Sequence, residues 1–103
     1  MTAKAPKTIR WKKAADDDLA AIVDRIATDS PQAAERFLDD LLSAVETLSR
    51  FPLTGAIFPR FPKARQLVFG NYVIYYTVSP REIVVRAVVH GARRFRVSWL
   101  RRR

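Results

Sequence analysis

Residues 66–90, QLVFGNYVIYYTVSPREIVVRAVVH, decide the fold. They are rich in β-branched and aromatic side chains, and only Gly70-Asn71 and the segment 79–82 interrupt them. A Gly-Asn pair between two apolar runs is typical of a two-residue hairpin, and a four-residue segment containing proline is typical of a tight turn. The pattern therefore predicts an antiparallel meander of three strands, at 66–69, 72–78 and 83–90.

Counting outward from the two turns predicts the register of the meander and the two faces of its sheet. The predicted pairs are Phe69 with Tyr72, Leu67 with Ile74, Val78 with Ile83, and Ile74 with Ala87. The face expected to pack against helices carries Leu67, Phe69, Tyr72, Ile74, Tyr76, Val78, Ile83, Val85, Ala87 and Val89. The other face carries Gln66, Val68, Val73, Tyr75, Thr77, Val84, Arg86, Val88 and His90.

The first half of the chain predicts one strand and two helices. Residues 8–11 are β-prone, and this strand is expected to join the meander because a lone strand cannot satisfy its backbone. Two apolar series then recur at helical spacing. They are Ala15, Leu19, Ile22, Val23 and Ile26, and Ala34, Phe37, Leu38, Leu41, Val45 and Leu48. Between them, Ser30-Pro31 is typical of a helix start, so the helices should pack as an antiparallel hairpin in an α+β fold.

Two other stretches have a structural and a functional interpretation. Asp16, Asp17 and Asp18 suit the first turn of a helix, and because consecutive side chains point in different directions no metal site is predicted from them. The proline-rich connector 52–63 is expected to lack regular structure. The phenylalanines within and beside it, Phe51, Phe58 and Phe61, either stack on nucleic-acid bases or fasten the loop to the core, and the second role is the commoner one in a small chain.

Length and composition predict one domain over residues 1–103, with a basic N-terminal tail at 1–7 and an arginine-rich C-terminal tail at 91–103. The absence of cysteine excludes thiolate metal sites and cysteine nucleophiles. With no apolar leader or membrane-length segment in the sequence, a cytoplasmic protein without a cofactor is expected.

Positive charge is concentrated in the second half of the chain. Residues 1–49 hold seven Lys and Arg against nine Asp and Glu, whereas residues 50–103 hold twelve against Glu82 alone. This asymmetry indicates an acidic partner, whether a protein or a nucleic acid. The candidate contact residues are Arg65, Arg86, His90, Arg93, Arg94 and Arg96. Gly91 is expected to turn the tail away from the sheet, where Phe95 and Trp99 accompany its arginines.

The chain resembles the ParE toxins of the ParE/RelE toxin-antitoxin superfamily over about Thr8 to Arg96. The resemblance lies in the helical hairpin AADDDLAAIVDRIATDSPQAAERFLDDLLSAVETLSRFPLTG, the strand pair RQLVFGNYVIYYTV and the last strand IVVRAVVHGARR. It implies a toxin that binds and inhibits DNA gyrase without chemistry of its own. It also implies a partner, a ParD-like antitoxin with a ribbon-helix-helix start, which would neutralise the toxin in a heteromeric complex. The outer faces of the helical hairpin, with Arg25, Arg36 and Asp39, are one place where this antitoxin would bind.

The RelE branch of the superfamily implies a different function, ribosome-dependent cleavage of mRNA. On this alternative Arg93 would stabilise the transition state and His90 would transfer a proton. However, Trp99 stands where the branch often has a tyrosine, and Val68 stands near the place of a further family arginine. A plain nucleic-acid-binding module is a third interpretation, and its binding would weaken steeply with salt.

Overall fold

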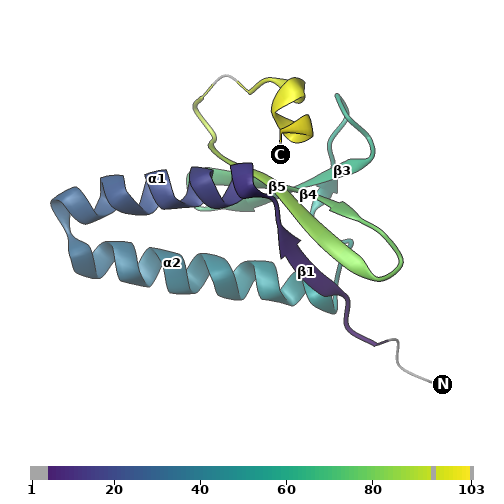
Figure 1. Ribbon diagram of the computed structural model, residues 1–103, viewed down its shortest axis with the longest axis horizontal. Coiled ribbons are helices and arrows are strands. Elements are labelled where there is room, and N and C mark those ends of the chain that lie inside the picture. Colours follow the sequence, from purple (N-terminus) through teal and green to yellow (C-terminus); the bar gives the residue numbers. More distant parts are fainter. Residues whose placement is uncertain (1–4, 94, 103) are drawn as a thin grey trace.

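A computed structural model describes residues 5–93 and 95–102, in which two helices cover one face of a five-stranded sheet (Figure 1). The helices are α1 (Lys13–Asp29) and α2 (Pro31–Glu46), and a short turn of 3₁₀ helix, η1 (Thr47–Ser49), follows them. The strands are β1 (Thr8–Trp11), β2 (Ala56–Ile57), β3 (Ala64–Phe69), β4 (Tyr72–Val78) and β5 (Glu82–His90). A second 3₁₀ turn, η2 (Val97–Arg101), ends the described chain.

The predicted helical hairpin is confirmed. Ser30 is the only residue between α1 and α2, and its hydroxyl accepts a hydrogen bond of 3.1 Å from the backbone N–H of Ala33, with Pro31 at the first helical position. This cap satisfies one of the free donors at the start of α2. The apolar stripes of both helices meet the sheet, so the hairpin is held by core packing.

The sheet contains the predicted meander and two further strands, in the order β1-β5-β4-β3-β2. As expected, β1 joins it, pairing parallel to β5 from Thr8 opposite Glu82 to Trp11 opposite Val85. The prediction that 52–63 has no regular structure was wrong at Ala56–Ile57, because β2 pairs antiparallel with β3 at that edge. The third strand also begins at Ala64, two residues earlier than predicted.

The register of the meander is confirmed up to a β-bulge. Phe69 pairs with Tyr72 and Val78 with Ile83, as counted from the turns. Tyr76 then pairs with Val85 but its neighbour Tyr75 pairs with Ala87, which leaves Arg86 as the extra residue of β5. A bulge shifts the pairing by one and exchanges the faces of the residues that follow. The predicted pair of Ile74 with Ala87 was therefore wrong, and Ile74 pairs with Val88.

The core is divided between the two faces of the sheet. The helix-covered face buries Ala15, Leu19, Ile22, Leu41, Val45, Tyr72, Ile74, Val85 and Val88 in one cluster, and Leu48, Tyr76 and Ile83 in another. The opposite face buries Phe58, Ala64, Tyr75, Ala87, Val89 and Leu100. Val88 thus lies on the helix side and Ala87 and Val89 on the opposite side, the reverse of the prediction, because the bulge at Arg86 inverts the alternation.

Candidate functional site

The C-terminal segment 95–102 folds back over the sheet. The prediction that Gly91 turns the chain away from the sheet was wrong, and η2 lies on the other side of the sheet from α2 (Figure 1). The ring of Phe95 stacks on Tyr75 at 4.2 Å between centroids and meets Phe58 and Trp99 edge-on. Leu100 is 1% exposed. Because these apolar side chains leave water together, the segment is part of the folded domain and carries its arginines on a fixed base.

An ion pair fastens the end of this segment to helix α1. The guanidinium of Arg102 donates two hydrogen bonds to the carboxylate of Asp18, of 2.7 and 3.1 Å. The same carboxylate accepts the backbone N–H of Val88 at 3.1 Å, on the edge of β5 beyond the end of its pairing with β1. Asp18 therefore joins α1, β5 and the C-terminal segment at one point, in the bidentate geometry that is strongest for arginine and carboxylate.

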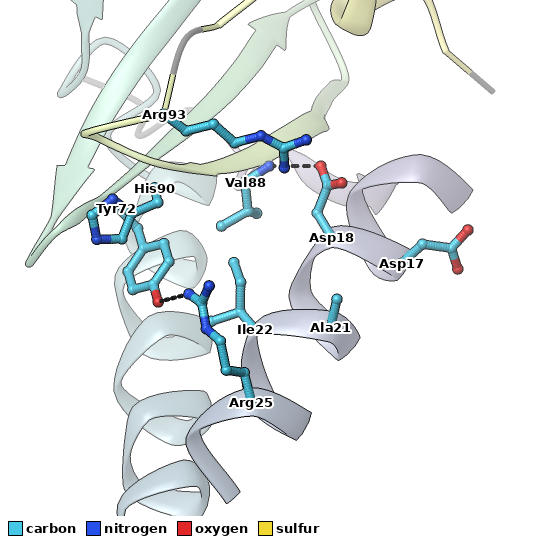
Figure 2. Close-up of a pocket in the computed structure, with 9 residues that line it drawn as sticks. All are labelled: Asp17, Asp18, Ala21, Ile22, Arg25, Tyr72, Val88, His90 and Arg93. Carbon is cyan, nitrogen blue, oxygen red and sulfur yellow. Dashed lines mark hydrogen bonds between the residues drawn. The ribbon is translucent and has the colours of Figure 1, made fainter. Parts of the chain in front are cut away.

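A cavity of about 240 Å³ lies beside this ion pair, between α1 and the end of β5 (Figure 2). His90 and Arg93 line it together with Asp17, Asp18, Ala21, Ile22, Arg25, Tyr72 and Val88. His90 reaches the cavity only because the bulge places it on the helix side, where its ring meets Tyr72 edge-on at 5.2 Å. The predicted candidates His90 and Arg93 are thus brought together, but His90 is not on the face of Arg86.

The polar groups of the cavity already have partners, some within its lining and others outside it. Arg25 donates a hydrogen bond of 2.9 Å to the hydroxyl of Tyr72, as Figure 2 shows. The guanidinium of Arg93 lies over the ring of Trp99, 4.7 Å from its centroid, a favourable cation–π contact. Neither the contact of Tyr72 with Arg25 nor the pairing of Asp18 with Arg102 was predicted. No local sequence pattern signals a contact between residues 84 positions apart, as Asp18 and Arg102 are.

The hydrogen bonding of His90 limits its chemistry. Its Nδ1 accepts the backbone N–H of Ala92 at 3.1 Å, so Nδ1 carries no proton. In the neutral ring the proton then belongs to Nε2, which leaves no free lone pair. His90 would have to give up the Ala92 bond before it acted as a general base.

The other predicted contact residues lie apart from this cavity. Arg65 donates a hydrogen bond of 2.7 Å to the carbonyl of Gly55, at the opposite edge of the sheet. Arg86 donates hydrogen bonds to the hydroxyl of Thr77 and to the carbonyl of Leu100. Arg96 is exposed on the segment before η2. Arg94 lies outside the described residues.

The three aspartates of α1 and the three phenylalanines in and beside the connector lie in different surroundings. Of the three aspartates, Asp16 lies in the first turn of α1, as predicted, while Asp18 is used at the ion pair. Phe58 is buried and Phe61 packs against the same cluster, so these two fasten the connector, whereas Phe51 is 66% exposed.

Within the described chain, no group of three or more His, Asp or Glu is placed to hold a metal ion. No helix there is both long and apolar enough for a membrane span.

The fold is of the α+β class, with a strand, a helical hairpin and an antiparallel meander, and it is similar to that of a solved ParDE structure. A chain of the structure "Chromosomal ParDE TA system from P. aeruginosa" superposes with a TM-score of 0.72 at 23% identity, over 84% of this chain and 98% of that chain. A Sinorhizobium fredii (strain NBRC 101917 / NGR234) protein named "Putative toxin Y4kP" is 33% identical over 87 residues, 82% of this chain and 88% of its own length. Residues 9–95 match the family described as "ParE toxin of type II toxin-antitoxin system, parDE". The chain belongs to this family and is a toxin of the ParDE type.

Proposed function

We propose that this toxin acts by binding DNA gyrase directly through its cationic C-terminal segment, and that it supplies no catalytic group. The observation that carries the proposal is the exposure of Arg96 and Arg101 on the C-terminal segment, whose apolar side chains pack against the sheet, and of Arg93 shortly before it, which lies over Trp99 of the segment. A cation held on a rigid base loses little conformational entropy when it binds an acidic surface. Of the described arginines in this segment, only Arg102 pairs with a carboxylate of the helices.

The geometry at His90 favours a binding protein over the nuclease alternative. His90 and Arg93 share a cavity, but the Ala92 bond to Nδ1 leaves the ring without a free acceptor. Arg93 is held over Trp99, which has no ionisable hydroxyl. A base and a transition-state donor would both have to leave their present partners before RNA cleavage.

We further propose that a ParD-like antitoxin neutralises the toxin by folding onto it. Apolar side chains are exposed on α2 and beyond it. Leu42, on the outer face of α2, is 41% exposed, and Leu53, in the connector that follows η1, is 63% exposed. Arg36 and Asp39 line the same outer face of α2. A partner that carries both apolar and charged residues would bury the first and pair with the second. We assign the helical hairpin to the antitoxin and the C-terminal segment to gyrase.

Supercoiling by purified gyrase tests the first proposal. Wild-type toxin should stop supercoiling at roughly stoichiometric amounts, and the double variant Arg93→Ala/Arg96→Ala should need much more protein for the same inhibition because two target contacts are lost. The double variant Arg50→Ala/Arg81→Ala removes the same charge from exposed positions outside the segment and should inhibit like wild type. Equal inhibition by all three proteins would contradict the assignment of this surface.

Toe-printing on a translated message tests the alternative. The proposal predicts no new cut sites in the message at toxin concentrations that inhibit gyrase. New cut sites that vanish in the His90→Ala variant, with gyrase unaffected, would replace the proposed function by mRNA cleavage.

A further inference from the structure

A second hollow lies on the sheet face that the C-terminal segment covers. Its volume is about 380 Å³, and it is formed by the connector, by the end of β4, by the bulge residue Arg86 in the middle of β5, and by η2. Its polar lining consists of Lys63, Thr77, Arg86 and Arg101, and Phe61 and Leu100 contribute apolar walls. Among residues 5–93 and 95–102, no acidic side chain lines it. The volume lies in the range of pockets that hold small ligands.

Three cations therefore converge on one hollow without an anion. Among the described residues, Lys63, Arg86 and Arg101 form no ion pair. The ion pairs there join Arg10 to Glu82, Lys13 to Asp17 and Arg102 to Asp18. A charged group that is partly removed from water without an oppositely charged partner is in an unfavourable environment. The arrangement is one that an anion would stabilise.

The β-bulge fixes Arg86 at the centre of this group. Its Nε donates to the Thr77 hydroxyl at 2.9 Å and its Nη1 to the Leu100 carbonyl at 3.3 Å. Both partners are neutral, and Nη2 has no acceptor among the described residues. The Thr77 hydroxyl accepts from Arg86, and its own proton has no acceptor among the described residues, so it can be donated to a ligand.

The environment of Arg86 disfavours its charge. Burial is the main cause that lowers the pKa of Arg86, and the positive charge of Arg10 lowers it further, while Glu82 raises it. Glu82 is itself held by Arg10 in a pair of 3.1 Å. These surroundings disfavour the charged guanidinium of the half-buried Arg86, whereas the surroundings of a structural ion pair favour the charged form.

We propose that this hollow binds a phosphate group. A phosphate carries up to two negative charges and several acceptor oxygens, which matches three cationic donors and one hydroxyl donor better than a single carboxylate does. Lys63 and Arg101 are exposed, so a phosphate reaches them from solvent. This site goes beyond the proposed function. It shares Arg101 with the C-terminal segment, but Lys63, Thr77 and Arg86 lie outside that segment, and phosphate binding is measured without gyrase.

Calorimetric titration of the full chain tests the site at constant ionic strength. The probes are inorganic phosphate, adenosine 5′-monophosphate and a single-stranded DNA of ten nucleotides. At least one should bind saturably. Lys63→Ala or Arg101→Ala should weaken that binding about tenfold each, the usual effect of a lost hydrogen bond between charged groups. Arg50→Ala, which removes an exposed arginine elsewhere, should leave it unchanged.

The three probes separate the sources of phosphate. Tighter binding of the monophosphate than of inorganic phosphate would indicate a nucleotide, and tighter binding of the oligonucleotide would indicate a nucleic-acid backbone. Absence of saturable binding by all three probes would overturn the proposal. Equal weakening by Arg50→Ala and by Lys63→Ala would also overturn it, since the effect would then come from net charge. Lys63 and Arg101 are exposed, so their variants remain informative even if Arg86→Ala fails to fold.

Discussion

Replacing Asp18 with alanine should loosen the C-terminal segment from the body of the protein. The carboxylate accepts two hydrogen bonds from Arg102 and one from the Val88 N–H. The side chains of Arg102 and Asp18 are 34% and 19% exposed, so the pair lies between a surface pair and a buried one. Surface pairs contribute up to about 1 kcal/mol, and breaking a buried pair costs about 3 to 5 kcal/mol. We therefore expect Asp18→Ala to lower the free energy of unfolding by about 2 to 3 kcal/mol.

A double-mutant cycle separates the ion pair from the rest of this effect. Arg102→Ala should cost about 1 to 1.5 kcal/mol, because Asp18 keeps the Val88 bond and gains access to water. The coupling energy between the two positions should be about 1 kcal/mol. Asp17→Ala is the matched control. Its partner is Lys13, and both side chains are mostly exposed, at 65% and 79%, so the loss should be a small fraction of that for Asp18→Ala.

Urea denaturation followed by tryptophan fluorescence measures these differences, because Trp99 lies in the segment that Arg102 fastens. In a chain of this size a loss of 2 kcal/mol corresponds to a fall in Tm of about 8 to 16 °C. The reasoning would be refuted if Asp18→Ala and Asp17→Ala were equally stable, or if the effects of Asp18→Ala and Arg102→Ala simply added.

Three further predictions concern the rest of the fold. Gly55→Ala should destabilise the protein by about 2 to 4 kcal/mol in chemical denaturation, because a Cβ there would lie 2.7 Å from the Tyr76 hydroxyl and 2.8 Å from a backbone carbonyl; wild-type stability would contradict the packing at this turn. Burial raises the pKa of Tyr75, so ultraviolet titration should show this tyrosine ionising above its ordinary value of 10.0, and the stability it contributes should be lost as the pH rises through that higher pKa; the Tyr75→Phe variant should lack this alkaline loss. A hydrogen bond from Arg10 lowers the pKa of Glu82, so the stability from this pair should be present above 4.5 and lost as the pH falls through the lower pKa of the folded state; a difference between wild type and Arg10→Ala that persists unchanged in strong acid would contradict it.

Most of the fold follows from local sequence signals. Gly70-Asn71 has the residue types of the hairpin turn that it forms, and Gly70 adopts the positive φ of 56° that such a turn needs. Ser30-Pro31 has the residue types of the helix cap that it forms. The alternation of apolar residues then sets the strands. The bulge at Arg86 has no such signal, because valines and alanine on both sides of it are equally suited to either face of the sheet.

The candidate site was predictable only in part. Its residue types follow from the concentration of arginine after Arg50, and the cavity does contain His90 and Arg93. The other side chains around His90 and Arg93 depend on the bulge and on the return of the C-terminal segment over the sheet. Both features are consequences of tertiary packing. Both faces of β5 are buried, so the alternation of its side chains does not determine its register. One face packs against Phe95 and Leu100, which lie outside the meander in the sequence.

Direct binding of the purified toxin to immobilised gyrase, measured across a series of salt concentrations, tests the central claim that a cationic segment fixed on the sheet recognises the target. The account predicts saturable binding that weakens as salt rises and that is strongly reduced by Arg93→Ala/Arg96→Ala but not by Arg50→Ala/Arg81→Ala. Absence of binding at low salt by a folded toxin that still arrests growth would contradict it.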